Sequence, residues 1–276
     1  MRAPRLHVIT ARDCAAAIIL RRGPSGQVAT IGWDRDSHAF EMGQWLKGRI
    51  YEHRSDLSPD GRNFIYFGGT GNPQSPSGGW YTAVSRAPWL HAVAFFAQSD
   101  TWFGGGAFTA PGTVWLNGGE GTFDDCVELT AEPDRRAYPH STDGFHMGDL
   151  YAAMMRQRGW QQSEGTTRYD TVLTRPCAGD WRLRLSFEVA AKNRSMISNR
   201  YGLVNAATGA MQDCPDWEWA EMRGRHLQFA AQGALHECGV APDGQIGKPT
   251  MIRDFAPMRF EAIRAPYDTR AGSADR

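Results

Sequence analysis

The sequence lacks the features that mark several large classes of protein. Its 30 basic and 30 acidic side chains cancel, so it has no basic excess for binding nucleic acid through bulk charge. It has no uninterrupted run of about eighteen apolar residues, so no membrane-spanning helix is predicted. The apolar run at residues 15–20 is short and follows Arg12 and Asp13, which is unlike a secretory signal and favours a cytoplasmic location.

The cysteines also lack a recognisable arrangement. They are odd in number and no two have C-x-x-C spacing, which argues against a disulfide framework and a structural zinc site. No serine or cysteine stands in a nucleophile motif such as G-x-S-x-G. We therefore expect no cofactor and favour a protein without catalytic activity. The five thiols are expected to be reduced and mostly buried: Cys14, Cys126, Cys177, Cys214 and Cys238.

What the sequence contains is short extended segments broken by turn residues. Apolar, β-branched and aromatic residues alternate with clusters of Gly, Pro, Asp and Ser, a pattern typical of an all-β fold. A hydrophobic content of 41% over 276 residues is enough for a buried core. The segments expected to form strands are residues 15–20, 27–33, 38–45, 49–53, 63–67, 80–85, 90–96, 113–116, 171–174, 181–189, 196–198, 201–205, 227–230 and 259–263.

One segment departs from this β pattern. Residues 147–158 place Leu150, Ala153 and Met154 at helical spacing, with Asp149 near the start and Gly159 able to end the helix. We predict one amphipathic helix there. The string W-E-W-A-E-M at residues 217–222 indicates a second, shorter helix.

Two pieces of the chain repeat a pattern. Residues 61–66 and 224–229 both read G-R-x-apolar-x-aromatic after a polar turn. Residues 112–116 resemble this pattern more weakly. Recurring hairpins of this kind favour a β-propeller over a sandwich, because a small twisted sheet must stack on neighbours to bury its faces. At roughly 40–50 residues per blade, the length allows five or six blades.

A turn motif adds a resemblance to known repeats. Residues 56–62 read D-L-S-P-D-G-R, a tight turn between strands. This string resembles the S-P-D-G turn of WD40-like, TolB-type β-propeller repeats. The block at residues 43–62 and the string D-T-W-F-G-G-G-A-F at 100–108 are similar to blocks in a group of bacterial proteins. These resemblances imply a propeller fold and no particular activity.

The sequence therefore predicts an all-β protein, a small β-propeller of five or six blades with one helical insertion near residues 147–158. A single domain is expected over residues 1–276, with a flexible C-terminal tail at 265–276.

A histidine-rich loop is the candidate metal site. His140, Asp143 and His146 lie close together before the predicted helix, and imidazole with carboxylate suits Zn²⁺ or Mn²⁺. The H-x5-H spacing is not a usual ligand pattern, however. A capping loop, with Asp143 or Asp149 at the helix start, is the favoured interpretation.

A glycine-rich loop is the second candidate. Gly104, Gly105 and Gly106 would let backbone amides approach a ligand, and Asp100 and Trp102 beside them are candidate binding residues. No lysine or helix follows as in a phosphate loop, and the string at 247–250 fails because Pro249 lacks an N–H. Turns are favoured at both places.

Scattered acids are the third candidate. Glycoside hydrolysis needs two carboxylates, which a propeller can supply from different blades. Each acid is otherwise explained as a turn former or a hydrated edge charge. The available residues are Asp34, Asp56, Asp125, Asp180, Glu188 and Glu218.

Tryptophan is abundant, with ten residues. Trp80, Trp217 and Trp219, together with Arg86, are candidate binding residues because aromatic and arginine side chains concentrate at protein interfaces. Packing between blades is the other interpretation. The favoured function is a non-catalytic protein–protein interaction module in a bacterial cytoplasmic complex. The alternative left open is a propeller that binds a small ligand, or binds or hydrolyses a carbohydrate, at a polar axial site.

Overall fold

The computed structural model describes residues 3–23, 26–75, 77–98, 100–118, 121–123, 126–138, 147–166, 169–189 and 197–269. Contacts between residues divide the chain into two compact units. Unit 1 contains Met1–Val8 and Pro133–Met258, and unit 2 contains Ile9–Glu132 and Arg259–Arg276. Each unit is described by itself.

Unit 2 contains three sheets of strands that are consecutive in sequence. The first sheet has the order β1 (Arg5–Thr10), β2 (Ala16–Arg22), β3 (Gln27–Asp34) and β4 (Phe40–Lys47). The second contains β5 (Arg49–Ile50), β6 (Asp56–Leu57), β7 (Asn63–Gly69), β8 (Trp80–Arg86) and β9 (Ala92–Gln98), with the short 3-10 helix η1 at Glu52–Arg54. The third contains β10 (Gly106–Ala110), β11 (Thr113–Leu116) and β12 (Thr130–Ala131).

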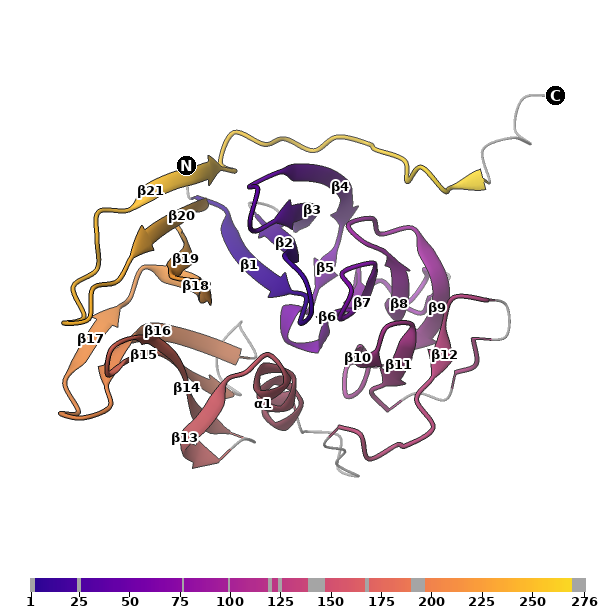
Figure 1. Cartoon of the computed structure of the whole chain (residues 1–276). Coiled ribbons are helices and arrows are strands. Elements are labelled where there is room, and N and C mark those ends of the chain that lie inside the picture. The colour runs from indigo at the N-terminus through magenta and orange to yellow at the C-terminus, as the bar shows by residue number, and fades with distance from the viewer. Residues whose placement is uncertain are drawn as a thin grey trace. The chain divides into compact units, whose positions relative to one another are not determined.

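Unit 1 contains two sheets and the helix α1 (Met147–Gln157). The first sheet has the order β13 (Gln161–Thr166), β14 (Asp170–Ala178), β15 (Trp181–Val189), β16 (Ile197–Asn205) and β17 (Met211–Cys214). The second has the order β18 (Trp217–Arg223), β19 (His226–Ala231), β20 (Ala234–Gly239) and β21 (Thr250–Asp254). Figure 1 shows α1 against the first of these sheets, where it contacts β13, β14 and β15.

Five sheets of this kind are the blades of a five-blade β-propeller, and the prediction of a small all-β propeller is confirmed. The expected helix at 147–158 is confirmed as α1, the one α-helix among the described residues. The number of blades is five, at the lower end of the expected range. None of the described helices has the length and apolar character needed to cross a membrane.

Strand alternation explains how each sheet acquires a buried face. In β15 the residues Leu183, Leu185 and Phe187 are at most 1% exposed, whereas the intervening side chains are partly or fully exposed. In unit 2, Ile18 and Leu20 of β2 pack with Phe64 and Tyr66 of β7 in one apolar cluster. Apolar area removed from water is the main favourable term in such folding.

Two expected elements are wrong. Residues 217–222 lie in the strand β18, because β19 pairs with Trp217 and with residues 219–222 around an irregularity at Glu218, and Trp219 and Glu221 are buried. Residues 259–263 form no strand. This segment instead packs through side chains on β4, where Phe260 lies 5.9 Å from the Trp45 ring and Gln44 donates a hydrogen bond to Ile263 O. Residues 197–198 and 201–205, expected in two strands, belong to the single strand β16, and Met196 lies outside the described residues.

The C-terminal segment is packed as far as residue 267. Ala265 is 3% exposed, and the Tyr267 hydroxyl donates a 2.7 Å hydrogen bond to His91 O. The expected tail at 265–276 and the single domain stay predictions, and residues 270–276 lie outside the described part of the chain.

The S-P-D-G turn is held by its own side chains. Ser58 Oγ donates to Asp60 Oδ1 (2.6 Å) and accepts from Asn63 N (2.9 Å), which fixes the entry into β7. Gly61 has a φ of +76°, and a Cβ at this position would lie 2.5 Å from Ala16 Cβ. The repeat partner Gly224 precedes β19 with a φ of +57°, but a Cβ there meets nothing within 4 Å.

Substitutions at Gly61 and Gly224 distinguish the effect of backbone strain on stability from the effect of close packing. We expect Gly61→Ala to lower the free energy of unfolding by about 2–4 kcal/mol, since left-handed φ and a steric overlap both oppose the new methyl group. The matched variant Gly224→Ala carries only the backbone cost, about 1–2 kcal/mol. Urea unfolding of the two variants measures the difference, and equal losses would contradict this account of the turn.

Candidate functional site

The binding residues expected on β8 have ordinary structural partners. The Trp80 ring is half-buried and stacks on Phe67 at 6.2 Å, with Tyr51 at 5.9 Å on its edge. Arg86 is exposed and donates to Glu128 Oε1 through Nε and Nη2, while its guanidinium lies 4.9 Å from the Tyr267 ring centroid. Trp80 therefore serves as packing, and Arg86 already has a carboxylate partner.

The expected tryptophans of unit 1 are also in packing positions. Trp217 is half-buried and stacks on Phe229 with ring centroids 4.6 Å apart. Trp219 is 3% exposed. Their side chains fill the sheet β18–β21, and little of their surface faces solvent.

The glycine-rich loop is shaped by close packing. A Cβ on Gly104 would overlap the Phe67 ring, and a Cβ on Gly105 would overlap Arg54 O. Both glycines have positive φ. They are therefore required for approach to the protein's own core. Within the loop, Asp100 Oδ1 accepts from Trp102 N at 2.9 Å, and Trp102 is 57% exposed.

A buried arginine that was not among the predicted site residues anchors this loop. Arg54 is 3% exposed and donates from Nη1 to Thr101 O (2.7 Å) and Phe103 O (2.8 Å). Its guanidinium lies 5.3 Å from the Phe67 ring centroid. Burial lowers the pKa of Arg54 to about 10. No local motif distinguishes this arginine, because its partners lie on a loop more than forty residues away.

The candidate metal residues His140, Asp143 and His146 lie outside the described residues. Asp149 lies in the first turn of α1, where a carboxylate favours the helix dipole. Among the residues that the structure describes, no three His, Cys, Asp or Glu side chains are grouped so as to hold a metal ion.

Most of the candidate acids have structural roles. Asp34 accepts hydrogen bonds from the Ser37 backbone and hydroxyl, which lower its pKa and close a turn. Asp56 is 4% exposed and accepts from Phe108 N (2.8 Å) and Leu57 N (2.9 Å). Glu218 accepts from Leu6 N. Asp180 lies exposed in the turn between β14 and β15, and Asp125 is outside the described residues.

Glu188 lines a recess in which several other charged residues also lie. The recess has a volume of about 590 Å³ and lies on one face of the sheet β13–β17 in unit 1. Its lining combines acidic, basic and hydroxyl side chains. The charged residues, together with Ser186, are Glu164, Asp170, Arg184, Glu188, Arg200 and Asp213.

The local sequence explains why this face is hollow. In the register of the sheet, Arg184 lies opposite Gly202 and Ser186 lies opposite Arg200, so these four positions share one face. The two small residues sit between long side chains and leave space above the sheet. The opposite face is apolar, with Phe187 5.1 Å from the Tyr151 ring of α1. One face of the sheet β13–β17 therefore packs in the core, and the other face carries the charged side chains.

Three charged side chains of the recess have no ion-pair partner in the part of the chain that the structure describes. Arg184 donates from Nη1 to Ser186 Oγ at 3.3 Å. Across the described ranges, no ion pair or hydrogen bond engages the side chains of Glu164, Glu188 or Arg200. These groups can exchange bound water for a ligand at modest cost, because no existing ion pair has to be broken.

A second hollow, of about 290 Å³, lies in unit 2. Its lining includes Phe40, Pro88 and small residues of β2 and β3, with Asp34 and Glu41 among them. Trp33, which also contributes to it, is 2% exposed and stacks with Phe40 at 6.1 Å. This hollow is smaller and less polar, and Asp34 is already engaged in its turn.

Three of the five thiols have a raised pKa. All five cysteines are free, as expected. Burial raises the pKa of Cys177, Cys214 and Cys238 to about 11. Few thiolates are therefore present at neutral pH at these three positions.

Comparisons with known proteins give no family. No family model and no curated protein matches the sequence, so the likeness of the S-P-D-G turn to WD40-like repeats stays a resemblance. Among solved structures, the chain is similar to a periplasmic gluconolactonase of Pseudomonas aeruginosa, with 13% identity over 94% of this chain and 88% of that one, at a TM-score of 0.35. It is also similar to a prolyl endopeptidase, with 10% identity over 89% of this chain and a TM-score of 0.29. The matched part is 35% of the endopeptidase chain. Similarities of this size say nothing about the activity of this chain.

The role of Asp56 can be tested against an exposed acid. We expect Asp56→Ala to lower the free energy of unfolding by about 2–4 kcal/mol, because the buried N–H groups of Leu57 and Phe108 lose their acceptor. Asp180→Ala removes a carboxylate from an exposed turn and should change stability by about 0.5 kcal/mol or less. Urea unfolding measures both. A loss for Asp56→Ala as small as that for Asp180→Ala would show that the carboxylate has no structural role.

The thiols can be tested by their reaction rates with a disulfide reagent at pH 8. With their pKa raised to about 11, Cys177, Cys214 and Cys238 should react about 100-fold more slowly in the folded protein than in denaturant. Mass spectrometry of the quenched reaction assigns each rate to a cysteine. Rates equal to those in denaturant at these three positions would contradict the burial argument.

Proposed function

We propose that this protein is a non-catalytic binding scaffold whose charged recess on the sheet β13–β17 holds a polypeptide segment of a partner. The observation that carries the proposal is an open recess in which Arg200, Glu164 and Glu188 share one face, and no ion pair within the described residues joins these three side chains. Its volume of about 590 Å³ lies within the range of roughly 300–1,000 Å³ found for pockets that hold small molecules. The cytoplasmic bacterial complex expected from the sequence remains a prediction.

The chemistry of the recess supports a polypeptide as its occupant. Arg184 and Arg200 supply donors for backbone carbonyls and carboxylates, and Ser186 lies between them. Glu164 and Glu188 supply acceptors for backbone N–H groups and for lysine or arginine. Arginine is enriched at protein interfaces, and the sheet beneath gives these groups a rigid base. Met211, 65% exposed at the rim, adds apolar area.

The proposal predicts the effect of reversing the two recess arginines. A peptide library displayed on phage is selected on the immobilised protein, and the enriched peptides are tested by calorimetry. We expect the double variant Arg184→Glu/Arg200→Glu to weaken peptide binding at least about tenfold. The two arginine donors are replaced by carboxylates, which repel the carboxylates and carbonyls of the peptide. The matched double variant Arg136→Glu/Arg225→Glu makes the same charge change at exposed positions outside the recess and should bind as the parent does.

The same preparation is tested against a panel of neutral and acidic saccharides. If no peptide is enriched, and a saccharide binds the parent protein but not the recess variant, the carbohydrate-binding alternative replaces the proposal. Peptides that bind both double variants equally well would place the interaction elsewhere on the molecule and contradict the proposal.

A further inference from the structure

We infer that the segment held in the recess carries a cationic side chain and a carboxylate two residues apart. This inference rests on the proposed function and specifies the kind of partner. It follows from how the two signs of charge are distributed over the sheet.

Acidic residues occupy one side of the recess and arginines the middle. Glu164 of β13 lies opposite Val172, and Asp170 of β14 lies opposite Glu188 of β15. Together they form an acidic edge over β13, β14 and the end of β15. Arg184 and Arg200 form the basic part over β15 and β16. The acidic Asp213 of β17 lies opposite Gly202, beyond the basic part.

This arrangement favours a ligand that carries both signs of charge over a ligand that carries one. A lone carboxylate drawn to Arg200 lies within a Debye length, about 8–10 Å, of the acidic edge, which repels it. A lone cation drawn to Glu188 is held by the acids but makes no use of the donors of Arg184 and Arg200. A segment with both charges pairs with the acidic edge and with the arginines at the same time. It is therefore preferred over segments that carry only one of the two charges.

The spacing follows from the register. Glu188 lies opposite Ser198, and Arg200 is two residues further along β16, so Glu188 and Arg200 are diagonal neighbours with Cα atoms about 7–8 Å apart. Side chains two residues apart on an extended peptide point to the same side and are about 6.6–6.8 Å apart. A Lys-x-Glu string in extended conformation therefore matches the pair. The side chains of Glu188 and Arg200 do not bond to each other, so both are available to it.

The experiment uses blocked pentapeptides and the full chain at low ionic strength. The probes are acetylated and amidated Gly-Lys-Gly-Glu-Gly, Gly-Lys-Gly-Gln-Gly and Gly-Gln-Gly-Glu-Gly, titrated into isotopically labelled protein and followed by NMR. We expect the doubly charged peptide to bind at least about tenfold more tightly than either singly charged one. Glu188→Gln should abolish the preference for lysine, and Arg200→Gln should abolish the preference for glutamate.

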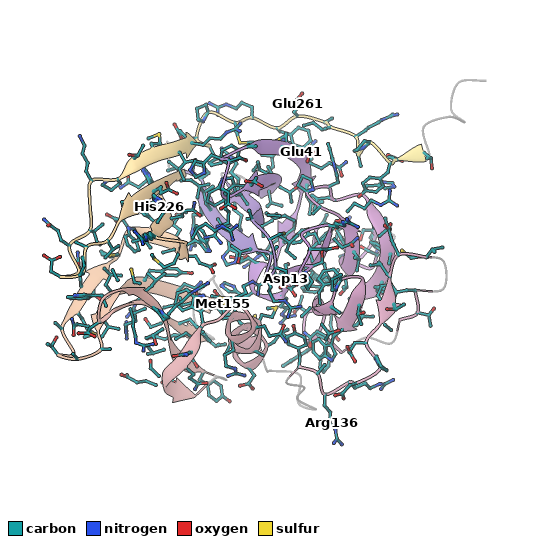
Figure 2. The ribbon with its side chains drawn as sticks, in the orientation of Figure 1. Asp13, Glu41, Arg136, Met155, His226 and Glu261 are labelled. Carbon is teal, nitrogen blue, oxygen red and sulfur yellow. The ribbon has the colours of Figure 1, made fainter. Side chains whose placement is uncertain are left out.

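Two exposed residues supply matched controls. Glu261→Gln and Arg136→Gln make the same chemical changes outside the recess, and Figure 2 shows both parent side chains extending away from the ribbon. Both variants should keep the affinity order of the parent protein. Circular dichroism establishes that all four variants are folded.

The inference is overturned if a singly charged peptide binds as tightly as the doubly charged one. It is also overturned if the preferences survive in Glu188→Gln and Arg200→Gln, or if none of the pentapeptides binds. Failure of the proposed function is a separate result, because it appears as phage-selected peptides that ignore the reversal of Arg184 and Arg200. If those peptides respond to the reversal but show no joint requirement for lysine and glutamate, the scaffold stands and only the partner's charge pattern is wrong.

Discussion

The structure depends on one constraint, that each small sheet must remove an apolar face from water while its other face remains compatible with its surroundings. The sheet β13–β17 shows the consequence most clearly. Leu183, Leu185 and Phe187 are buried on the side of α1, so the alternating positions Arg184, Ser186 and Glu188 must all share the opposite face. The charged recess is thus a direct result of strand alternation combined with the two small residues Ser186 and Gly202.

The same constraint explains why several conspicuous residues are structural. Trp80 and Trp217 supply large apolar area to thin sheets, and their rings stack on neighbouring aromatic residues. Arg54 donates hydrogen bonds to the carbonyls of Thr101 and Phe103, which fixes the glycine-rich loop. Residue types that suggest a binding site in the sequence are here used to close turns and to fill the space between strands.

Local patterns in the sequence were sufficient for the fold class, the helix near 147–157 and most strands, because turn residues and apolar spacing act over short distances. They were insufficient at residues 217–222, where an apolar string with two glutamates fits either a helix or a buried strand until β19 pairs with it. Local sequence patterns could not predict the recess, for another reason. Glu164, Ser186 and Arg200 come together only through the register of four strands, and the only local signal was the alternation R-L-R-L-S-F-E-V at residues 182–189.

The most direct test of the account is a crystal structure of the chain with a phage-selected peptide bound. The account predicts an extended segment across β14, β15 and β16, with a carboxylate within hydrogen-bond distance of Arg184 or Arg200 and a cationic group at Glu188. A peptide seated on another surface, with the recess arginines paired to the protein's own carboxylates, would contradict it.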